Sequence, residues 1–376
     1  MLRNSTHGPP MGFLQKIARS ESPQFSANPD VFRIDVSPVP GGGMACFAAR
    51  DLSDSDTILT VKEPAASVIM KKFRKEVCAW CYSYAINSNL RIKVSVKEDR
   101  GIAWFCSLEC RDSWMKNVGD AGWEAICAFE DGLGRTKGPC VEHADIPCGS
   151  GEVETLWEKA LQDGNQIMTR RLAKPRSALK TATLPANVDI DVARFILSSF
   201  IPLKNAEDVD VIRRLVPTLA PYTSSQITIH QHIQIYHYLL SVLPIASPIL
   251  ASISPVNIAS LVTRDAGNSW GVWDEALAGD ELFAYCLYPT ASYFNHSCTP
   301  NVTQRRLGRT YSFHVKDNVA LGDELNVSYL GEAVSKLSFQ ERQKKLLVSV
   351  VYHHLIVLLI PFISLAGASH AHVRDA

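Results

Sequence analysis

Between residues 288 and 301 the chain reads Tyr288-Pro289-Thr290-Ala291-Ser292-Tyr293-Phe294-Asn295-His296-Ser297-Cys298-Thr299-Pro300-Asn301. An apolar approach ends in adjacent polar side chains, and Pro300 then fixes a turn. Asn295 offers amide donors and an acceptor, and His296 offers a ring nitrogen on each side. Buried together, these two side chains need hydrogen-bond partners, which a bound polar ligand can supply. The stretch therefore predicts a ligand site.

A second informative segment begins 26 residues after Asn295 and ends in a tyrosine. It reads Leu321-Gly322-Asp323-Glu324-Leu325-Asn326-Val327-Ser328-Tyr329. The pattern predicts a turn over 321–324 and then a strand over 325–330 that delivers the hydroxyl of Tyr329. An isolated tyrosine at a strand end is usually a packed or surface aromatic. The combination of both segments favours a functional role for Tyr329.

Four of the ten cysteines form two close pairs, Cys78-x2-Cys81 and Cys106-x3-Cys110. Two such pairs can hold one zinc ion in a tetrahedron of thiolates, and a closed shell of this kind stabilises structure and performs no chemistry. Reduced cysteines buried as small hydrophobic residues are the alternative. A further set, Cys140-x2-His143-x4-Cys148, could also bind a metal, although an ordinary polar loop is the simpler interpretation.

The overall composition limits the class of protein. The 376 residues are 46% hydrophobic, and 38 basic residues balance 38 acidic ones. This balance argues against a chain held to nucleic acid mainly by phosphate neutralisation. The first 30 residues contain no apolar signal-peptide core, and clustered cysteines are typical of a reducing compartment. We therefore expect the nucleus, the cytoplasm or both.

At these motifs the sequence resembles the SET-domain methyltransferases. The resemblance rests on Asn295-His296-Ser297-Cys298 with Pro300-Asn301, and on Gly322-Asp323-Glu324-Leu325 with Ser328-Tyr329. Two upstream elements add to it, Gly41-Gly42-Gly43-Met44 and Asn268-Ser269-Trp270-Gly271. It covers roughly residues 33 to 345. With a cysteine cluster interrupting the first β-rich segment, the arrangement is similar to the SET-and-MYND group.

The resemblance implies an activity and a set of residues for it. The activity is transfer of a methyl group from S-adenosylmethionine to a lysine of a protein, a histone tail being one candidate, with a role in chromatin regulation. Main-chain groups at Gly43 and Met44, together with Asn295 and His296, would bind the cofactor. Tyr329 would orient the lysine amine, and Tyr288 is a further candidate for the substrate pore. We expect a monomer.

Two departures from the family pattern leave a second interpretation open. A MYND finger carries eight ligands for two zinc ions, and the cluster here supplies four, which predicts a single zinc. No cysteine follows Cys298, whereas the family closes its channel with a cysteine-rich post-SET segment. The alternative is a SET-fold protein-binding module with little or no methyl transfer.

Hydrophobic periodicity predicts a mixed α+β chain whose β-rich ends bracket a cysteine cluster and a helical insert. The resemblance implies that these ends form a β-rich SET fold, split by a small zinc-binding insertion and the helical insert and ending in helix. Its expected parts are a flexible leader at 1–30, the amino-terminal SET part at 31–70, a MYND-like zinc insertion at 71–120, a helical insert at 121–265, the carboxyl-terminal catalytic part at 266–335, a post-SET helix start at 336–347 and an atypical hydrophobic tail at 348–376.

The tail allows three interpretations. It is almost entirely apolar from Val348 to Ala368 and long enough to span a membrane, but His353, His354 and Pro361 weaken that interpretation. It could instead be a helix that packs on the core. It could also be translated intron or an altered reading frame in place of the post-SET segment. A membrane association is not the expectation.

Overall fold

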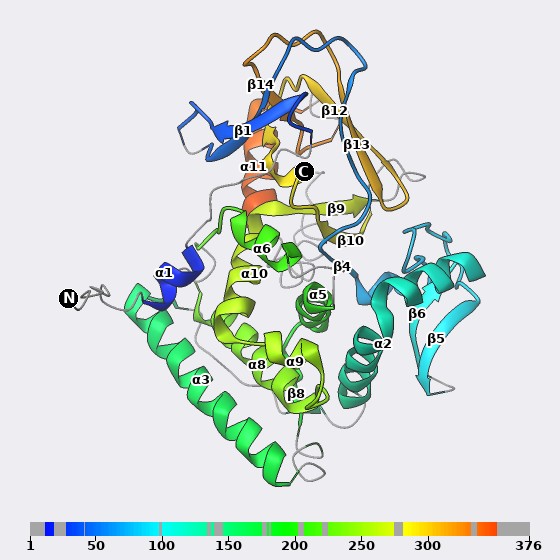
Figure 1. Cartoon of the computed structure of the whole chain (residues 1–376), viewed down its shortest axis with the longest axis vertical. Helices are drawn as coiled ribbons and strands as arrows, with labels where there is room; N and C mark the ends of the chain where they lie inside the picture. Colours follow the sequence, from blue (N-terminus) through cyan, green and yellow to red (C-terminus); the bar gives the residue numbers. More distant parts are fainter. Residues whose placement is uncertain are drawn as a thin grey trace, which may run out of the picture.

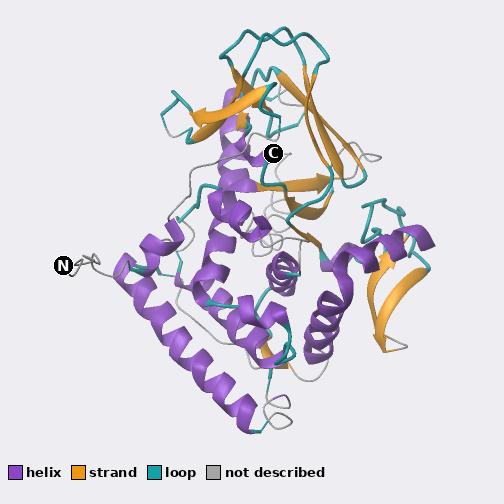
Figure 2. Ribbon diagram, in the orientation of Figure 1, coloured by secondary structure: helices purple, strands orange, loops and turns teal. Residues whose placement is uncertain are grey.

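A computed structural model describes residues 12–18, 28–40, 42–97, 100–133, 137–138, 146–174, 179, 182–201, 207–219, 225–273, 281–331 and 337–351. Small sheets gather at one end of the molecule, helices fill the middle, and the cysteine-containing unit projects at one side (Figures 1 and 2). The predicted mixed α+β class is confirmed. Cys140, His143 and residues 352–376 of the tail lie outside the described residues.

The β-rich end consists of three small sheets. The first has the order β1 (Phe32–Val36), β2 (Met44–Ala48), β14 (Glu324–Val327), β11 (Asn295–His296). The second has the order β4 (Ala66–Ile69), β10 (Leu282–Leu287), β9 (Ser269–Trp273), and the third β12 (Val302–Leu307), β13 (Thr310–Val315), β3 (Thr57–Val61). Each sheet joins strands from both ends of the chain, so the two SET parts form one body.

The helical insert packs beneath these sheets. Its elements are α2 (Leu108–Leu133), β7 (Lys137–Gly138), α3 (Ser150–Ala173), β8 (Leu184–Pro185), α5 (Ile190–Phe200), α6 (Glu207–Arg214), α8 (Gln226–Val242), α9 (Pro248–Ser252) and α10 (Pro255–Asn268). Capping residues set several helix starts: Asp189 accepts from the N–H of Asp191, and Ser254 accepts from the N–H of Asn257. Buried Trp157, Phe195 and Leu239 join these helices to a core shared with the sheets.

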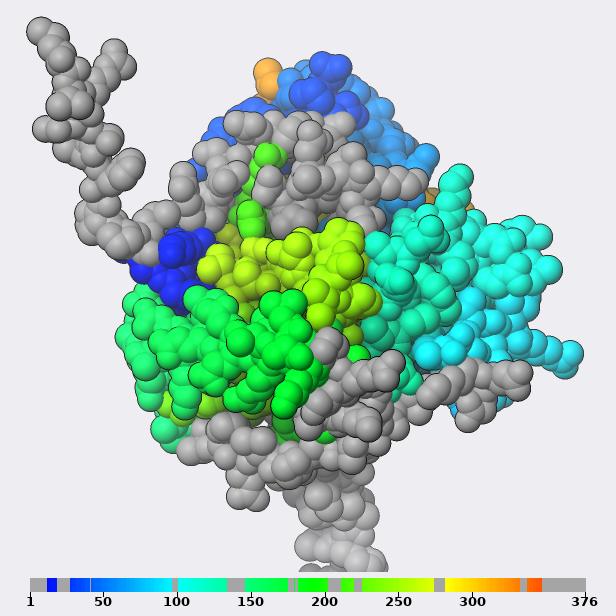
Figure 3. Space-filling view, turned by 60° about the horizontal axis from the view of Figure 1, so that its bottom comes forward, coloured from blue at the N-terminus to red at the C-terminus, as the bar shows by residue number. Residues whose placement is uncertain are grey.

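The cysteine unit forms a lobe beside the helices, drawn in cyan in Figure 3. Its elements are the 3-10 turn η1 (Lys71–Phe73), the hairpin β5 (Ile92–Lys97) and β6 (Arg100–Phe105), and the start of α2. Ser107 caps the start of α2, because its hydroxyl accepts from the N–H of Cys110 at 3.2 Å. Cys78, Ala103 and Phe105 form its own small core. The unit is therefore packed separately from the main core.

The structure differs from the expected leader at α1 (Phe13–Ala18). A helix of this length is marginal on its own, so tertiary contacts must hold it. Phe13 stacks on Trp157 with ring centroids 5.5 Å apart, and Arg264 donates to the carbonyl of the fully buried Ile17 at 3.0 Å. Sequence composition alone gives no sign of these distant partners.

The carboxyl-terminal helix α11 (Phe339–Val351) begins two residues after the predicted start at Leu337 and includes the first residues of the apolar tail. Within the described part of the chain no helix has the length and apolar character needed to cross a membrane. The three interpretations of the tail concern residues outside that part.

Candidate functional site

The two carboxyl-terminal motifs meet in the first sheet. Strand β11 pairs with β14 in parallel, placing Asn295 opposite Asn326 and His296 opposite Val327. Strand β14 in turn pairs antiparallel with β2, so the glycine-containing entry before Met44 lies in the same sheet. Three separate segments of the sequence thus lie in one sheet, as expected if the motifs form a single site.

Asn301 holds strand β14 beside the first motif through two side-chain hydrogen bonds. Its side-chain amide donates to the carbonyl of Glu324 at 2.9 Å, and its side-chain oxygen accepts from the N–H of Asn326 at 2.8 Å. A side chain here imitates a neighbouring strand and satisfies main-chain groups that would otherwise be unpaired. This explains why Asn301 belongs to the motif, a role that sequence reasoning did not assign.

Asn295 ties the crossing to the glycine turn. Its Nδ2 donates to the carbonyl of Gly42 and to Oε1 of Glu324, both at 3.0 Å. The other carboxylate oxygen of Glu324 accepts from the hydroxyl of Ser37 at 2.9 Å. Gly43 has a φ of +62°, a left-handed conformation that a glycine adopts without strain. Asn295 therefore fixes the glycine turn that leads into Met44, and the carbonyl of Gly43 accepts from the N–H of Ser37 at 2.8 Å.

His296 is occupied on both ring nitrogens. Nδ1 accepts from the N–H of Tyr329 at 3.0 Å, and Nε2 lies 3.3 Å from the sulfur of Cys298. Burial lowers the pKa of His296, so the ring is neutral near pH 7. Because Nδ1 accepts, the proton must sit on Nε2 and point to Cys298. The imidazole thus positions the main chain of Tyr329, and both of its ring nitrogens are engaged within the protein.

Tyr329 does not end a strand as predicted, because β14 stops at Val327 and the tyrosine lies in the following turn. The residue is 41% exposed, but its hydroxyl lies inward and donates to the carbonyl of Phe294 at 2.9 Å. Burial around the hydroxyl raises the pKa of Tyr329 to about 12, so it stays protonated at neutral pH. With its proton directed at Phe294, the hydroxyl oxygen can accept from a substrate.

Tyr288 is enclosed in an aromatic layer behind the site. Tyr288 is 1% exposed, and its hydroxyl donates to the carbonyl of Arg309 at 2.6 Å. Its ring packs edge-on against Tyr311 at 5.2 Å, and Phe294 stacks on Phe313 at 4.8 Å in the same layer. Sequence reasoning missed the stacking of Phe294 on Phe313, since the first lies just before β11 and the second in β13 of another sheet. A pore role for Tyr288 stays a prediction.

The four paired cysteines come together as predicted. Their sulfur atoms all lie within 4.8 Å of one another, with Cys81 and Cys106 at 3.5 Å and Cys106 and Cys110 at 3.6 Å. Zinc–sulfur bonds of about 2.3 Å in a tetrahedron require sulfur atoms about 3.8 Å apart, so this donor set suits one such ion. Hydrogen bonds from the Cys81 thiol and from main-chain N–H groups lower the pKa of Cys78 to about 5, which favours the thiolate.

The cysteine unit rests on the turn between β12 and β13. The guanidinium of Arg309 lies 3.9 Å from the ring centre of Trp80, and a Cβ at Gly308 would come within 3.3 Å of the carbonyl of Cys81. Gly308 also has a φ of +62°. The close approach to Cys81 and the positive φ both explain why residue 308 is a glycine. The contact between Arg309 and Trp80 joins the cysteine unit to the residue whose carbonyl accepts from the hydroxyl of Tyr288.

Comparison with known proteins agrees with this geometry. The family described as SET domain matches residues 43–330. The "Potential protein lysine methyltransferase SET6" of Saccharomyces cerevisiae is 24% identical over 324 residues, covering 77% of this chain and 85% of that protein. "Histone-lysine N-methyltransferase ASHR1" of Arabidopsis thaliana is 22% identical over 321 residues, covering 85% of this chain and 53% of that protein. A SET and MYND domain-containing protein of Dictyostelium discoideum is 34% identical over 71 residues, 19% of this chain and 18% of that protein.

The family match includes Gly43, the motif from Asn295 to Asn301 and the turn at Tyr329. The structure joins these segments through the hydrogen bonds of Asn295, His296 and Asn301. This chain belongs to the SET domain family.

Proposed function

We propose that this chain transfers a methyl group from S-adenosylmethionine to the side-chain amine of a lysine in a protein. One observation carries the proposal: Tyr329 is anchored through its N–H to His296 and through its hydroxyl to Phe294, and Asn295, which lies between these two residues, donates to Gly42 in the glycine turn. Three consecutive residues of the first motif thereby hold both the tyrosine hydroxyl and the glycine turn. The names of the yeast and Arabidopsis relatives support the same reaction class.

The cofactor recess would be lined by Gly43, Met44, Asn295 and His296. Nδ2 of Asn295 is engaged by Gly42 and Glu324, whereas its Oδ1 accepts no hydrogen bond among the described residues. An amide oxygen in that position suits an ammonium donor such as the amino group of the cofactor. When bound, S-adenosylmethionine supplies an electrophilic methyl group on a sulfonium.

Tyr329 acts by orientation. Its pKa of about 12 makes it a poor general base at neutral pH, and its proton is directed at the carbonyl of Phe294. The hydroxyl oxygen then accepts a hydrogen bond from the lysine amine and aims the nitrogen lone pair at the methyl group, since in-line displacement depends on alignment. Loss of the lysine's own proton to solvent precedes this step, and a desolvated channel favours it by lowering the amine pKa.

A zinc ion held by Cys78, Cys81, Cys106 and Cys110 would stabilise the insertion without taking part in the reaction. The proposed protein substrates include histone tails. The chain itself is proposed to act as a monomer in the nucleus or the cytoplasm. The even charge balance gives no support for direct nucleic-acid binding.

Labelled S-adenosylmethionine, incubated with core histones and with whole lysate, tests the activity. Tyr329→Phe should lower turnover by about 100-fold or more while cofactor affinity, measured by calorimetry, stays close to wild type. Tyr238→Phe is a matched control, because Tyr238 also donates to a main-chain carbonyl, that of Phe129 at 2.7 Å, but within the helical insert.

Equal turnover in Tyr329→Phe and wild type would remove Tyr329 from the mechanism. Cofactor binding without methylation of any protein in either pool would favour the alternative of a SET-fold binding module.

A further inference from the structure

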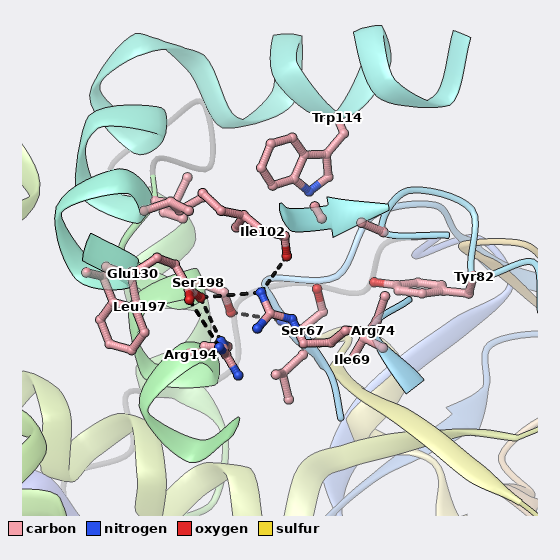
Figure 4. A pocket seen from close by; sticks show the side chains of 16 residues that line it. Ser67, Ile69, Arg74, Tyr82, Ile102, Trp114, Glu130, Arg194, Leu197 and Ser198 are labelled. Carbon is pink, nitrogen blue, oxygen red and sulfur yellow. Dashed lines mark hydrogen bonds and ion pairs between the residues drawn. The ribbon is translucent and has the colours of Figure 1, made fainter. Parts of the chain in front are cut away.

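A cavity of about 130 Å³ lies between the cysteine unit, β4 and the helices α2 and α5 (Figure 4). None of its lining residues belongs to the site around Asn295 and Tyr329. Its wall combines apolar side chains with two arginines and a glutamate. The proposed methyl transfer makes no use of these charges, so they call for a separate explanation.

The charges are unevenly shared. Arg194 holds Glu130 through Nε at 2.8 Å and Nη2 at 3.2 Å, and it holds Asp191 through Nη1 at 3.1 Å. Arg74 reaches Glu130 only once, through Nη2 at 3.3 Å. Two carboxylates therefore serve Arg194, and Arg74 is the least compensated charge of the group.

Arg74 is also the residue with donors to spare. Its two polar contacts in the described part of the chain, to the carbonyl of Ile102 and to Glu130, both use Nη2. The side chain is only 16% exposed, and Figure 4 shows its guanidinium projecting into the middle of the cavity. Burial and the charge of Arg194 together lower the pKa of Arg74 to about 10, more than the charges of Glu130 and Asp191 offset. A buried guanidinium in this state is stabilised by an added anion.

The rest of the wall selects what can accompany the anion. Trp114, Ile126 and Leu197 line the cavity with apolar surface, and Ile102 adds its side chain beside its engaged carbonyl. A doubly charged phosphate would be repelled by the nearby Glu130 and would leave these walls unused. A carboxylate carries a single charge and matches the planar edge of an arginine in two-pronged fashion.

We propose that this cavity binds a carboxylate joined to a small branched apolar group, with the carboxylate on Nε and Nη1 of Arg74 and the apolar group against Trp114, Ile126 and Leu197. The shared chemistry has two sources. One is a free short-chain acid, and the other is the carboxyl-terminal residue of a protein chain, with a side chain such as that of leucine.

Calorimetric titration of the full chain tests the site with three acids: isovalerate, N-acetyl-leucine and a hexapeptide ending in leucine. Each is compared with its carboxamide, which has the same shape and no charge. The acids should bind at least about tenfold more tightly than the amides. Binding of isovalerate alone supports a free acid as the ligand, and binding of the hexapeptide at similar affinity supports a chain terminus.

Arg74→Gln should abolish the preference for acid over amide, whereas the exposed Arg50→Gln should keep it. Thermal melting followed by circular dichroism shows whether each variant is folded. If Arg74→Gln does not fold, Arg74→Lys and the cavity-filling Ala103→Leu replace it, and both should weaken acid binding at least about tenfold.

The proposal is overturned if wild-type protein binds acids and amides equally. It is also overturned if no acid binds at concentrations up to about 10 mM, or if the folded Arg74 and Ala103 variants bind acids as wild type does.

Discussion

Nδ1 of His296 accepts a hydrogen bond from the main-chain N–H of Tyr329 at 3.0 Å, and the two rings lie 5.3 Å apart. The histidine of the first motif thus sets the place of the tyrosine of the second. Tyr329 lies in a turn after β14, so strand pairing does not fix its position. The hydrogen bond to His296 fixes it instead. The relationship links the two motifs mechanically as well as in the sequence.

Replacing His296 should therefore disturb the reaction more than the fold. In His296→Ala the N–H of Tyr329 loses its acceptor, and a displaced hydroxyl should lower kcat by about 10- to 100-fold. Steady-state methylation assays measure this, with His314→Ala as control, because His314 lies on β13 and its ring bonds the hydroxyl of Thr57 at 3.2 Å within the third sheet. Wild-type kcat in His296→Ala would contradict the positioning role.

The same histidine should make stability depend on pH. Burial lowers the pKa of His296, so below its ordinary value of 6.5 the unfolded chain takes up a proton that the folded chain resists. Its stabilising contribution is present above that value and is lost as the pH falls below it. Urea unfolding between about pH 5 and pH 8 should show a shallower pH dependence for His296→Gln than for wild type. Parallel curves would show that another group is responsible.

Asn301 should contribute to stability through two hydrogen bonds that hold β14 against the first motif. Asn301→Ala leaves the N–H of Asn326 without its acceptor and the carbonyl of Glu324 with only the side-chain amide of Asn326 as a side-chain donor, which should cost about 1 to 3 kcal/mol in the free energy of unfolding. Denaturant unfolding measures the loss. The exposed Asn318→Ala removes a single surface hydrogen bond, to the N–H of Asp54, and should change stability by less than about 0.5 kcal/mol. A similar cost for both variants would argue against a locking role.

The cysteine cluster should contain one zinc ion per chain. Metal analysis of purified protein should find it, and Cys106→Ser should lower the zinc content and the melting temperature. Cys127→Ser is the control, because Cys127 lies on α2 outside the cluster. Zinc contents of zero or two per chain would contradict the one-ion arrangement.

Arg309 should keep the cysteine unit attached to the β12–β13 turn. Arg309→Ala removes a cation–π contact with Trp80 worth about 0.5 to 2 kcal/mol. Faster amide exchange is then expected in residues 77–84, measured by hydrogen–deuterium exchange, while the exposed Arg305→Ala should leave it unchanged. Unchanged exchange in Arg309→Ala would mean that other contacts suffice.

The sequence predicted the site best where chemistry is local. The motif spacing predicted that Asn295, His296 and Tyr329 lie together, and the pairing of the cysteines predicted the cluster; the structure brings both sets together. Ser107 caps its helix through a contact that depends only on adjacent residues. The part boundaries, the cofactor and pore residues and the compartment stay predictions.

Long-range contacts could not be predicted in this way. Helix α1 exists because Trp157 and Arg264 lie next to it, and neither is near it in the sequence. Phe294 lies just before β11 and Phe313 lies in β13 of another sheet, so their stacking depends on tertiary packing that a single sequence does not reveal. The charge imbalance at Arg74 arises from Arg194, 120 residues further along the chain, and only the folded structure brings them together.

Arg309 also restricts how this protein can be rearranged. Its side chain lies on Trp80 in the insertion, while its carbonyl receives the hydroxyl of Tyr288 in the aromatic layer. A chimera that exchanges the insertion for that of a relative would have to exchange the β12–β13 turn with it, and a deletion would leave a guanidinium without its aromatic platform. The insertion and this turn are thus expected to be inherited as a unit, although Trp80 and Arg309 lie 229 positions apart in the chain.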